Sequence, residues 1–242
     1  MDNVLVTGAS RGLGLAIATR LAQDGFCVTG VARKPGEGFA AAAQSLTGPG
    51  ALHFESFDLA DIAAIPAFVR ELRERRGPIY GLVNNAGVGG EGLLATMKTQ
   101  EIEALLRLNT LSPIVLTKYV ARGMMAEGRG RIVNIASIVA ATGFNGLSVY
   151  AASKAALTGF TRSLAREVGR VGVTVNAIAP GYVDTEMTRG LDATQRERIA
   201  GRAALRRLAE PQDIAAMASL LMGEGGRNIS GAVLTVDAGA TA

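Results

Sequence analysis

Short apolar runs alternate along this chain with segments in which apolar residues recur every three or four positions. The runs are typical of buried strands, and the longer period is typical of helices that cover them. Strands that alternate with helices form a parallel sheet. The pattern therefore predicts a single α/β domain over residues 1–242, a doubly wound parallel sheet of about seven strands with helices on both faces. The expected strands cover residues 4–6, 28–31, 52–54, 79–83, 132–135, 173–178 and 232–236.

Glycines cluster directly after the first expected strand. Gly8, Gly12 and Gly14 allow the backbone to turn tightly and to approach a diphosphate, whose charge the N-terminus of the next helix can stabilise. Their spacing differs from the usual G-x-G-x-x-G fingerprint of dinucleotide sites. Two interpretations remain, a dinucleotide-binding loop or a turn that only packs the helix on the strand.

Two cations follow the second expected strand, where the adenosine ribose of a dinucleotide would lie. An acidic side chain at this position binds a free 2′-hydroxyl, whereas an arginine can chelate a 2′-phosphate. The chain has Arg33 and Lys34 here, and Arg11 lies within the glycine loop. We therefore predict NADP(H) rather than NAD(H) as the cofactor, against the alternative that both arginines are simply solvated.

Tyr150 and Lys154 are four residues apart in an expected helix, so a phenol and an ammonium group share one face. A neighbouring cation stabilises a phenolate and should lower the pKa of the tyrosine from about 10 toward the neutral range. Such a pair can transfer a proton, although most pairs of this spacing are a half-buried ring beside a solvated amine. The other motifs of the chain decide between these readings.

Further motifs follow the glycine loop along the chain. They are Asp58-Leu59, Asn84-Asn85-Ala86-Gly87, Asn109, Ser137, Tyr150 with Lys154, and Asn176 to Gly181. The order of these motifs resembles the short-chain dehydrogenase/reductase family from about Val4 to Gly239, and this resemblance implies a Rossmann-type fold. Within the family, residues 176–191 and 207–211 are similar to β-ketoacyl-[acyl-carrier-protein] reductases of fatty acid biosynthesis, whereas the loop at 87–92 departs from theirs.

The resemblance implies a role for each of four catalytic residues. Tyr150 would protonate the substrate oxygen as hydride arrives, and Ser137 would hydrogen-bond to the same oxygen. Lys154 would bind the nicotinamide ribose and lower the pKa of the tyrosine, while Asn109, in a locally distorted helix, would hold a water that links Lys154 to solvent. Taken alone, Ser137 could be an ordinary strand-end serine and Asn109 a helix-surface amide.

The resemblance also implies which residues contact the dinucleotide. Asp58 would contact the adenine, and Asn85 would support the strand beside the cofactor. The segment from Pro180 to Thr185 would cover the nicotinamide, with the backbone of Val183 at its carboxamide. The full set of expected cofactor contacts is Gly8, Ser10, Arg11, Gly12, Leu13, Gly14, Arg33, Asp58, Leu59, Asn85, Gly87, Tyr150, Lys154, Pro180, Gly181, Val183 and Thr185.

Substrate specificity is expected in the loops at residues 88–97, 140–149 and 184–211, of which the last would act as a lid. The resemblance implies a β-ketoacyl thioester as the substrate, with acyl carrier protein as a possible partner. The alternatives are another ketone, an acyl-CoA or a secondary alcohol and, least favoured, a non-catalytic nucleotide-binding regulator. Candidates for an apolar substrate pocket, each of which could equally be ordinary packing, are Phe144, Leu147, Tyr182 and Met187.

Two further expectations concern surfaces. Arg129 and Arg131, expected near the rim of the site, could dock an acidic carrier protein, although solvated arginines are the simpler reading. The expected helices at 99–125 and 149–168 carry small or apolar residues over more of their circumference than one sheet contact needs. With the family resemblance, this implies a homotetramer or else a homodimer.

Composition argues against several classes of protein. The net charge is +4, the basic residues are scattered, and no Trp and only four Tyr are present, so we expect no nucleic-acid partner. No apolar run approaches the roughly 18 to 20 residues that span a bilayer. The chain enters its first strand without a signal-peptide pattern, and we expect a cytoplasmic protein.

The single cysteine and the single histidine offer little chemistry. Cys27 cannot form an internal disulfide and is expected as a buried structural thiol. His53 lies in the third expected strand, where a structural role is favoured. One histidine leaves no basis for a His-based triad or a His/Cys zinc site, so we expect no metal.

Overall fold

Seven parallel strands form one sheet in the order β3-β2-β1-β4-β5-β6-β7 in the computed structural model, which describes residues 1–184 and 192–242. The doubly wound parallel sheet predicted from the sequence is confirmed. Each strand begins within two residues of its expected position. The strands are β1 (Asn3–Thr7), β2 (Cys27–Ala32), β3 (Ala51–Ser56), β4 (Ile79–Asn84), β5 (Gly130–Ile135), β6 (Val173–Pro180) and β7 (Val233–Val236).

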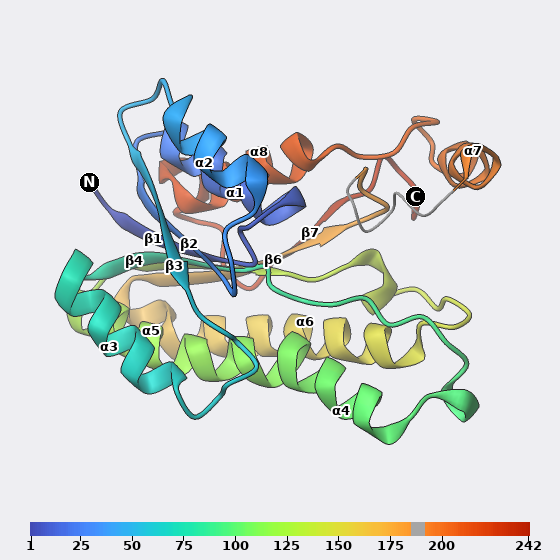
Figure 1. The fold of residues 1–242 in the computed structure, drawn as a ribbon, viewed down its shortest axis with the longest axis horizontal. Helices are drawn as coiled ribbons and strands as arrows, with labels where there is room; N and C mark the ends of the chain where they lie inside the picture. The colour runs from blue at the N-terminus through green and yellow to red at the C-terminus, as the bar shows by residue number, and fades with distance from the viewer. Residues whose placement is uncertain (185–191) are drawn as a thin grey trace.

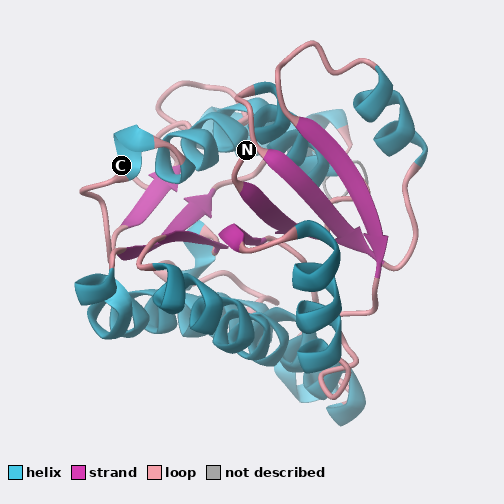
Figure 2. Cartoon of the chain, turned by 90° about the vertical axis from the view of Figure 1, so that its left-hand side faces the viewer, coloured by secondary structure: helices cyan, strands magenta, loops and turns pink. Residues whose placement is uncertain are grey.

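Helices cover both faces of the sheet (Figure 1). Helices α1, α2 and α8 lie on one face, and α3, α4, α5 and α6 lie on the other; Figure 2 shows the same layers from the side. The helices are α1 (Gly12–Gln23), α2 (Glu37–Gln44), α3 (Ile65–Arg76), α4 (Thr99–Leu106), α5 (Ser112–Glu127), α6 (Ser148–Val168), α7 (Ala193–Arg202) and α8 (Pro211–Met222).

The apolar runs of the central strands bury side chains on both faces of the sheet. Leu21 and Ile214 belong to the core cluster under α1 and α8, and Leu72 and Leu116 belong to the cluster under α3 and α5. All residues of β5 and β6 are buried. Continuous apolar runs are what a sheet covered on both faces requires, and this explains why strand positions were predictable.

The expected helix at residues 99–125 is divided into three parts. A five-residue π-helical turn, Arg107–Leu111, separates α4 from α5. Pro113 lies in the first turn of α5 and has no N–H to donate to the carbonyl of Asn109, four residues earlier. The proline therefore accounts for a break in the α-helical hydrogen bonding at Asn109.

The chain reverses its direction of winding between β1 and β4, which are neighbours in the sheet. In open α/β sheets, ligands bind in the crevice outside the carboxyl ends of the strands at this point. The glycine loop follows β1 and the Asn84-Asn85-Ala86-Gly87 motif follows β4, so the topology places both motifs at this crevice.

Candidate active site

The glycine loop is packed so closely that side chains cannot replace two of its glycines. Gly8 has φ +67°, and a Cβ there would lie 2.8 Å from Cα of Ala86. A Cβ at Gly14 would overlap the carbonyl oxygen of Gly8. The glycines thus close the loop onto the N-terminus of α1, where no side chain of the described residues caps the first turn. This arrangement fits a diphosphate bound by backbone amides.

Thr7 and Asn85 join the glycine loop to the loop after β4. The Thr7 hydroxyl accepts hydrogen bonds from the backbone amides of Asn85 and Ala86 at 2.9 and 3.0 Å. Nδ2 of Asn85 donates to the carbonyls of Thr7 and Gly8 at 2.9 and 3.3 Å. Asn85 therefore lies beside the glycine loop, on the side where the cofactor is expected, and Thr7 is a second connection between the two loops, to which no role was assigned from the sequence.

The loop after β2 lies against the glycine loop. A Cβ on Gly36 would overlap the carbonyl oxygen of Ser10, so only glycine allows this approach. Ser56 donates to the carbonyl of Arg33 at 2.8 Å, and the Arg33 side chain is exposed. The structure thus brings Arg33 to the side of the crevice that also carries Ser10 and Arg11. Gly36 was not singled out from the sequence, although a glycine soon after a strand end is the available signal.

Asp58 and Leu59 follow β3 at the same edge. The Asp58 carboxylate accepts a hydrogen bond from the amide of Ala60 at 2.9 Å and is otherwise exposed. The Leu59 side chain is buried in the core cluster under α3. Of these two expected contacts, Asp58 offers a side chain to a ligand, whereas Leu59 can offer only its backbone.

Ser137 and Tyr150 come together from separate elements. Ser137 follows β5, and its hydroxyl accepts a hydrogen bond from the amide of Val139 at 3.4 Å. Tyr150 lies in the first turn of α6 and shares a hydrogen bond with Ser137. Burial raises the pKa of Tyr150, and the hydrogen bond to Ser137 lowers it by a smaller amount. The phenol is therefore protonated at neutral pH, as a proton donor must be.

Lys154 is buried one turn further along α6, with 5% of its surface exposed. Its Nζ donates to the carbonyl of Ile135 at 2.9 Å and lies 5.7 Å from the centroid of the Tyr150 ring. Burial lowers the pKa of Lys154 to about 8. The expectation that Lys154 lowers the pKa of Tyr150 is wrong for this structure, because burial dominates at both groups.

Asn109 is buried in the π-helical turn, and its side chain is held on both sides. Its Oδ1 accepts from the amide of Val88 and its Nδ2 donates to the carbonyl of Val88, both at 2.9 Å. Nδ2 also lies 3.3 Å from the hydroxyl of Ser153, which donates to the carbonyl of Tyr150 at 2.7 Å. The side chain thus connects the loop after β4 to α6. Its backbone carbonyl, four residues before Pro113, lacks the N–H that would be its usual α-helical partner.

Gly87 lies between two of these side chains, those of Asn109 and Lys154. A Cβ on Gly87 would lie 3.1 Å from Oδ1 of Asn109 and 3.6 Å from Nζ of Lys154. The backbone after β4 therefore passes directly beside Nζ of Lys154. A larger residue would press against the asparagine that holds this loop.

The segment after β6 carries the residues expected at the nicotinamide. Pro180 is buried at the end of β6, and a Cβ on Gly181 would lie 2.7 Å from Cβ of Asp237. Val183 is buried and pairs with Ala209 in an isolated bridge. Thr185, also expected at the cofactor, lies outside the described residues.

Two of the four expected pocket residues touch. The rings of Phe144 and Tyr182 meet edge to face with centroids 6.4 Å apart. Leu147 belongs to the same turn as Phe144, since its amide donates to the Phe144 carbonyl at 3.3 Å. Met187 lies outside the described residues. An apolar wall from the turn before α6 and the segment after β6 is therefore present.

Arg129 and Arg131 are not at the rim of the active site, contrary to the sequence expectation. They lie at the start of β5, and Ser137 follows its opposite end. Arg129 forms an ion pair with Asp2, and both guanidinium groups lie near the Tyr80 ring, with Cζ at 4.5 and 5.7 Å from its centroid. Arg131 is 8% exposed, so it offers little surface to a carrier protein.

Cys27 and His53 lie away from this edge. Cys27 begins β2 and is half-buried rather than fully buried as expected, because it lies at the start of the strand. His53 lies in the edge strand β3, and burial and then the charge of Arg76 lower its pKa. The described residues contain no group of His, Cys, Asp and Glu that could hold a metal, and no described helix is long and apolar enough to span a membrane.

Comparisons with known proteins agree with this site. Residues 2–196 match the family described as short chain dehydrogenase. The chain is 40% identical to the 3-oxoacyl-[acyl-carrier-protein] reductase FabG of Pseudomonas aeruginosa, over 97% of this chain and 95% of that protein. It is 35% identical to the 3-oxoacyl-[acyl-carrier-protein] reductase MabA of Mycobacterium tuberculosis, over 98% and 92%.

Solved structures point the same way. A short chain dehydrogenase from Burkholderia cenocepacia, crystallised in complex with NADP, has a TM-score of 0.92 and 38% identity, covering 100% of this chain and 98% of that one. A dehydrogenase/reductase from Sinorhizobium meliloti has a TM-score of 0.91 and 34% identity, covering 100% and 95%. The glycine loop, the Ser137, Tyr150 and Lys154 centre and these matches over nearly the whole chain agree, and the chain belongs to the short-chain dehydrogenase family of oxidoreductases.

Proposed function

We propose that this protein is an NADPH-dependent reductase of β-ketoacyl thioesters, carried by acyl carrier protein or by CoA. The observation that carries the proposal is the proximity of Ser137, Tyr150 and Lys154, beside a glycine loop in which Gly8 and Gly14 leave no room for a Cβ. The similarity over 97% of the chain to proteins named 3-oxoacyl-[acyl-carrier-protein] reductase supports the thioester as substrate.

Each residue of the centre has a distinct task in the proposed reaction. When bound, the nicotinamide cofactor supplies the hydride that reduces the carbonyl carbon. Tyr150 gives its hydroxyl proton to the carbonyl oxygen, and Ser137 donates a hydrogen bond to the same oxygen as negative charge develops there. The raised pKa of Tyr150 keeps this proton in place until the oxygen becomes basic enough to take it.

Lys154 and Asn109 restore the proton. Lys154 holds one N–H on the carbonyl of Ile135 and has two further donors, which can bind the nicotinamide ribose and a water. Pro113 provides no N–H to the backbone carbonyl of Asn109, so this carbonyl can accept a hydrogen bond from that water. A pKa near 8 allows Lys154 to pass a proton onward at near-neutral pH.

Cofactor preference depends on Arg33. We expect Arg33→Ala to weaken NADPH binding roughly 10- to 100-fold, because a charge-assisted pair with a phosphate contributes about 1.5–3 kcal/mol. NADH, which has no 2′-phosphate, should bind almost unchanged. Titration of both dinucleotides by calorimetry tests this, and equal losses for the two would remove the assignment.

Substrate class is tested by following NADPH oxidation with acetoacetyl and longer β-ketoacyl thioesters beside a panel of simple ketones. Rapid turnover of the thioesters supports the proposal. Activity confined to ketones would keep Tyr150 and Lys154 in their roles and contradict the thioester assignment. Tyr182→Ala is the matched variant for the apolar wall with Phe144, and it should raise KM more for the longer acyl chains than for acetoacetyl.

We also propose a homo-oligomer, a tetramer or else a dimer, built on α4, α5 and α6. Ala152, Ala156 and Gly159 share an exposed face of α6. Leu106, Leu111 and Met125 expose between 37% and 44% of their surface on the neighbouring elements. Close packing of small residues with exposed apolar side chains is suited to pairing helices between subunits. The mass in solution, measured by light scattering, tests this.

A further inference from the structure

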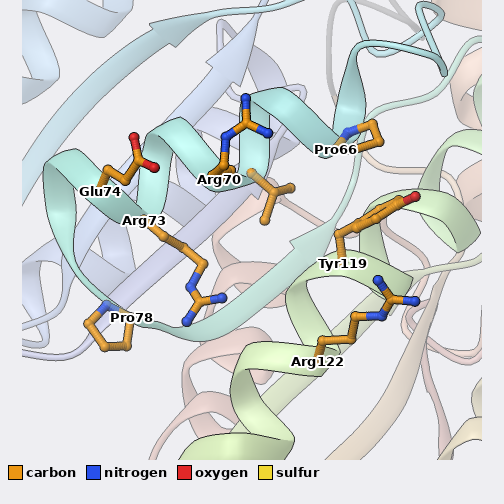
Figure 3. A pocket seen from close by; sticks show the side chains of 8 residues that line it. Pro66, Arg70, Arg73, Glu74, Pro78, Tyr119 and Arg122 are labelled. Carbon is orange, nitrogen blue, oxygen red and sulfur yellow. The ribbon is translucent and has the colours of Figure 1, made fainter.

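A cavity of about 510 Å³ lies between α3 and α5, away from the catalytic centre. Figure 3 shows the α3 side chains on one side of it and Tyr119 and Arg122 of α5 on the other. None of the proposed catalytic or cofactor residues lines it. The lining residues are Pro66, Val69, Arg70, Arg73, Glu74, Pro78, Tyr119 and Arg122. Its volume is within the range of small-molecule sites.

The arginines of α3 divide into two groups. Arg75 and Arg76 form ion pairs with Glu55 at 3.0 and 3.4 Å. Within residues 1–184 and 192–242, Arg70 and Arg73, which line the cavity, form no ion pair, and neither does Arg122 across from them. Three guanidinium charges and the single carboxylate of Glu74 leave two net positive charges at the cavity.

The absence of a side chain at Gly123 allows the guanidinium group of Arg73 to lie close to α5. A Cβ on Gly123 would lie 3.2 Å from Cζ and 3.3 Å from one terminal nitrogen of Arg73. The guanidinium group therefore lies beside α5, while the Arg73 side chain remains exposed. An arginine of α3 is thus placed on the same side of the molecule as Arg122 of α5, and both line the cavity.

Tyr119 adds an aromatic surface with two cations beside it. Nζ of Lys118 and Cζ of Arg122 each lie 5.3 Å from the centroid of its ring. Tyr119 is half-buried, and with the apolar Val69 and two prolines it forms the uncharged part of the cavity wall. The cavity thus combines arginine donors with an apolar surface.

We propose that this cavity binds a small ligand in which a phosphate group is attached to an apolar or aromatic body. Arginine forks match the oxygens of a phosphate, and a phosphate monoester carries close to two negative charges near neutral pH. That charge balances the two net positive charges at the cavity, whereas a single carboxylate would balance only one. The body of the ligand would lie on Tyr119 and Val69.

The test uses phenyl phosphate as the probe and the full-length protein saturated with NADPH, so that the dinucleotide site is already filled. Calorimetry should detect binding of phenyl phosphate that is tighter than that of inorganic phosphate, and phenol should not compete. The double variant Arg73→Gln/Arg122→Gln should bind about tenfold or more weakly. Arg75→Gln is the matched control, because Arg75 pairs with Glu55 outside the cavity. The affinity of this variant for phenyl phosphate should equal that of the unaltered protein.

Three results would overturn the proposal. The first is no binding of phenyl phosphate at millimolar concentration, and the second is that Arg75→Gln weakens its binding as much as the double variant does. The third is a change of oligomer mass in the double variant, which would make the cavity part of a subunit interface. Arg122→Gln alone serves if the double variant fails to fold. Ketone reduction should be unchanged in every variant, so a failure here is distinguishable from a failure of the proposed reductase activity.

Discussion

Tyr150 and Tyr119 each lie close to a positively charged side chain, but their surroundings differ. Nζ of Lys154 is 5.7 Å from the centroid of the Tyr150 ring, and Nζ of Lys118 is 5.3 Å from that of Tyr119. Lys154 is buried, whereas Lys118 is exposed. At the first pair, burial lowers the pKa of Lys154 to about 8 and raises that of Tyr150.

The difference shows that distance between a tyrosine and a cation does not by itself make an acid–base site. The electrostatic effect of a charge and the cost of keeping it both grow as water is removed. Of the buried pair, Lys154 therefore titrates near pH 8 while Tyr150 stays protonated. The exposed arginines at the α3–α5 cavity instead keep a fixed positive charge that suits an anion. Variants made in parallel at the two tyrosines can test this contrast.

The largest effect is expected for Tyr150→Phe. Loss of the proton donor should lower kcat roughly 10²- to 10⁴-fold while NADPH affinity changes little, because general acid catalysis contributes on that order. The matched variant Tyr119→Phe removes a hydroxyl from the other ring and should leave turnover unchanged. Steady-state kinetics and NADPH titration check both, and full turnover in Tyr150→Phe would sink the proposed mechanism.

A stability effect of up to about 3 kcal/mol is expected for Lys154→Met, from the conversion of a pKa shift into free energy. Because the pKa of Lys154 falls from 10.5 to about 8 on folding, the unfolded chain binds more protons between these pH values. In the unaltered protein, burial of charged Lys154 should therefore lower the free energy of unfolding. This loss is complete below pH 8 and disappears as the pH rises toward 10.5.

Urea unfolding between pH 7 and 10 measures this directly. Lys154→Met should be more stable than the unaltered protein at pH 7, should lose that advantage as the pH rises, and should be inactive. The exposed Lys118→Met should show neither the advantage nor its loss. A destabilised Lys154→Met at pH 7 would mean that the hydrogen bond to Ile135 outweighs the cost of burying the charge.

The smallest effects compare glycines at the two sites. Gly14→Ala places a Cβ on the carbonyl of Gly8 and should destabilise the protein by about 1–3 kcal/mol and weaken dinucleotide binding. In Gly123→Ala, the added Cβ contacts only the flexible end of the Arg73 side chain. The higher helix propensity of alanine should therefore stabilise the protein by up to about 1 kcal/mol. Thermal unfolding of the two variants measures this difference. Equal changes in their unfolding temperatures would contradict the close packing of the glycine loop.

The strands and the crevice were predictable because local features determine them. The apolar runs at residues 132–135 and 173–178 could be buried only in a sheet covered on both faces. The glycines after β1 and the Tyr150–Lys154 spacing are likewise local signals. The division of the long helix was also encoded locally, by Pro113, and it lies at Asn109, where a local distortion of the helix was expected.

The sequence by itself therefore determined the order of the elements and the chemical groups at the ends of the strands, because hydrophobic period and glycine placement act over a few residues. Only the tertiary structure decided how far these groups are buried, and with it the direction of the pKa shifts at Tyr150 and Lys154. It also decided which distant side chains meet, such as Phe144 with Tyr182. It also placed Arg129 and Arg131 at the start of β5, the end of that strand opposite the active site. Burial and long-range contacts depend on packing between elements, which no local pattern specifies.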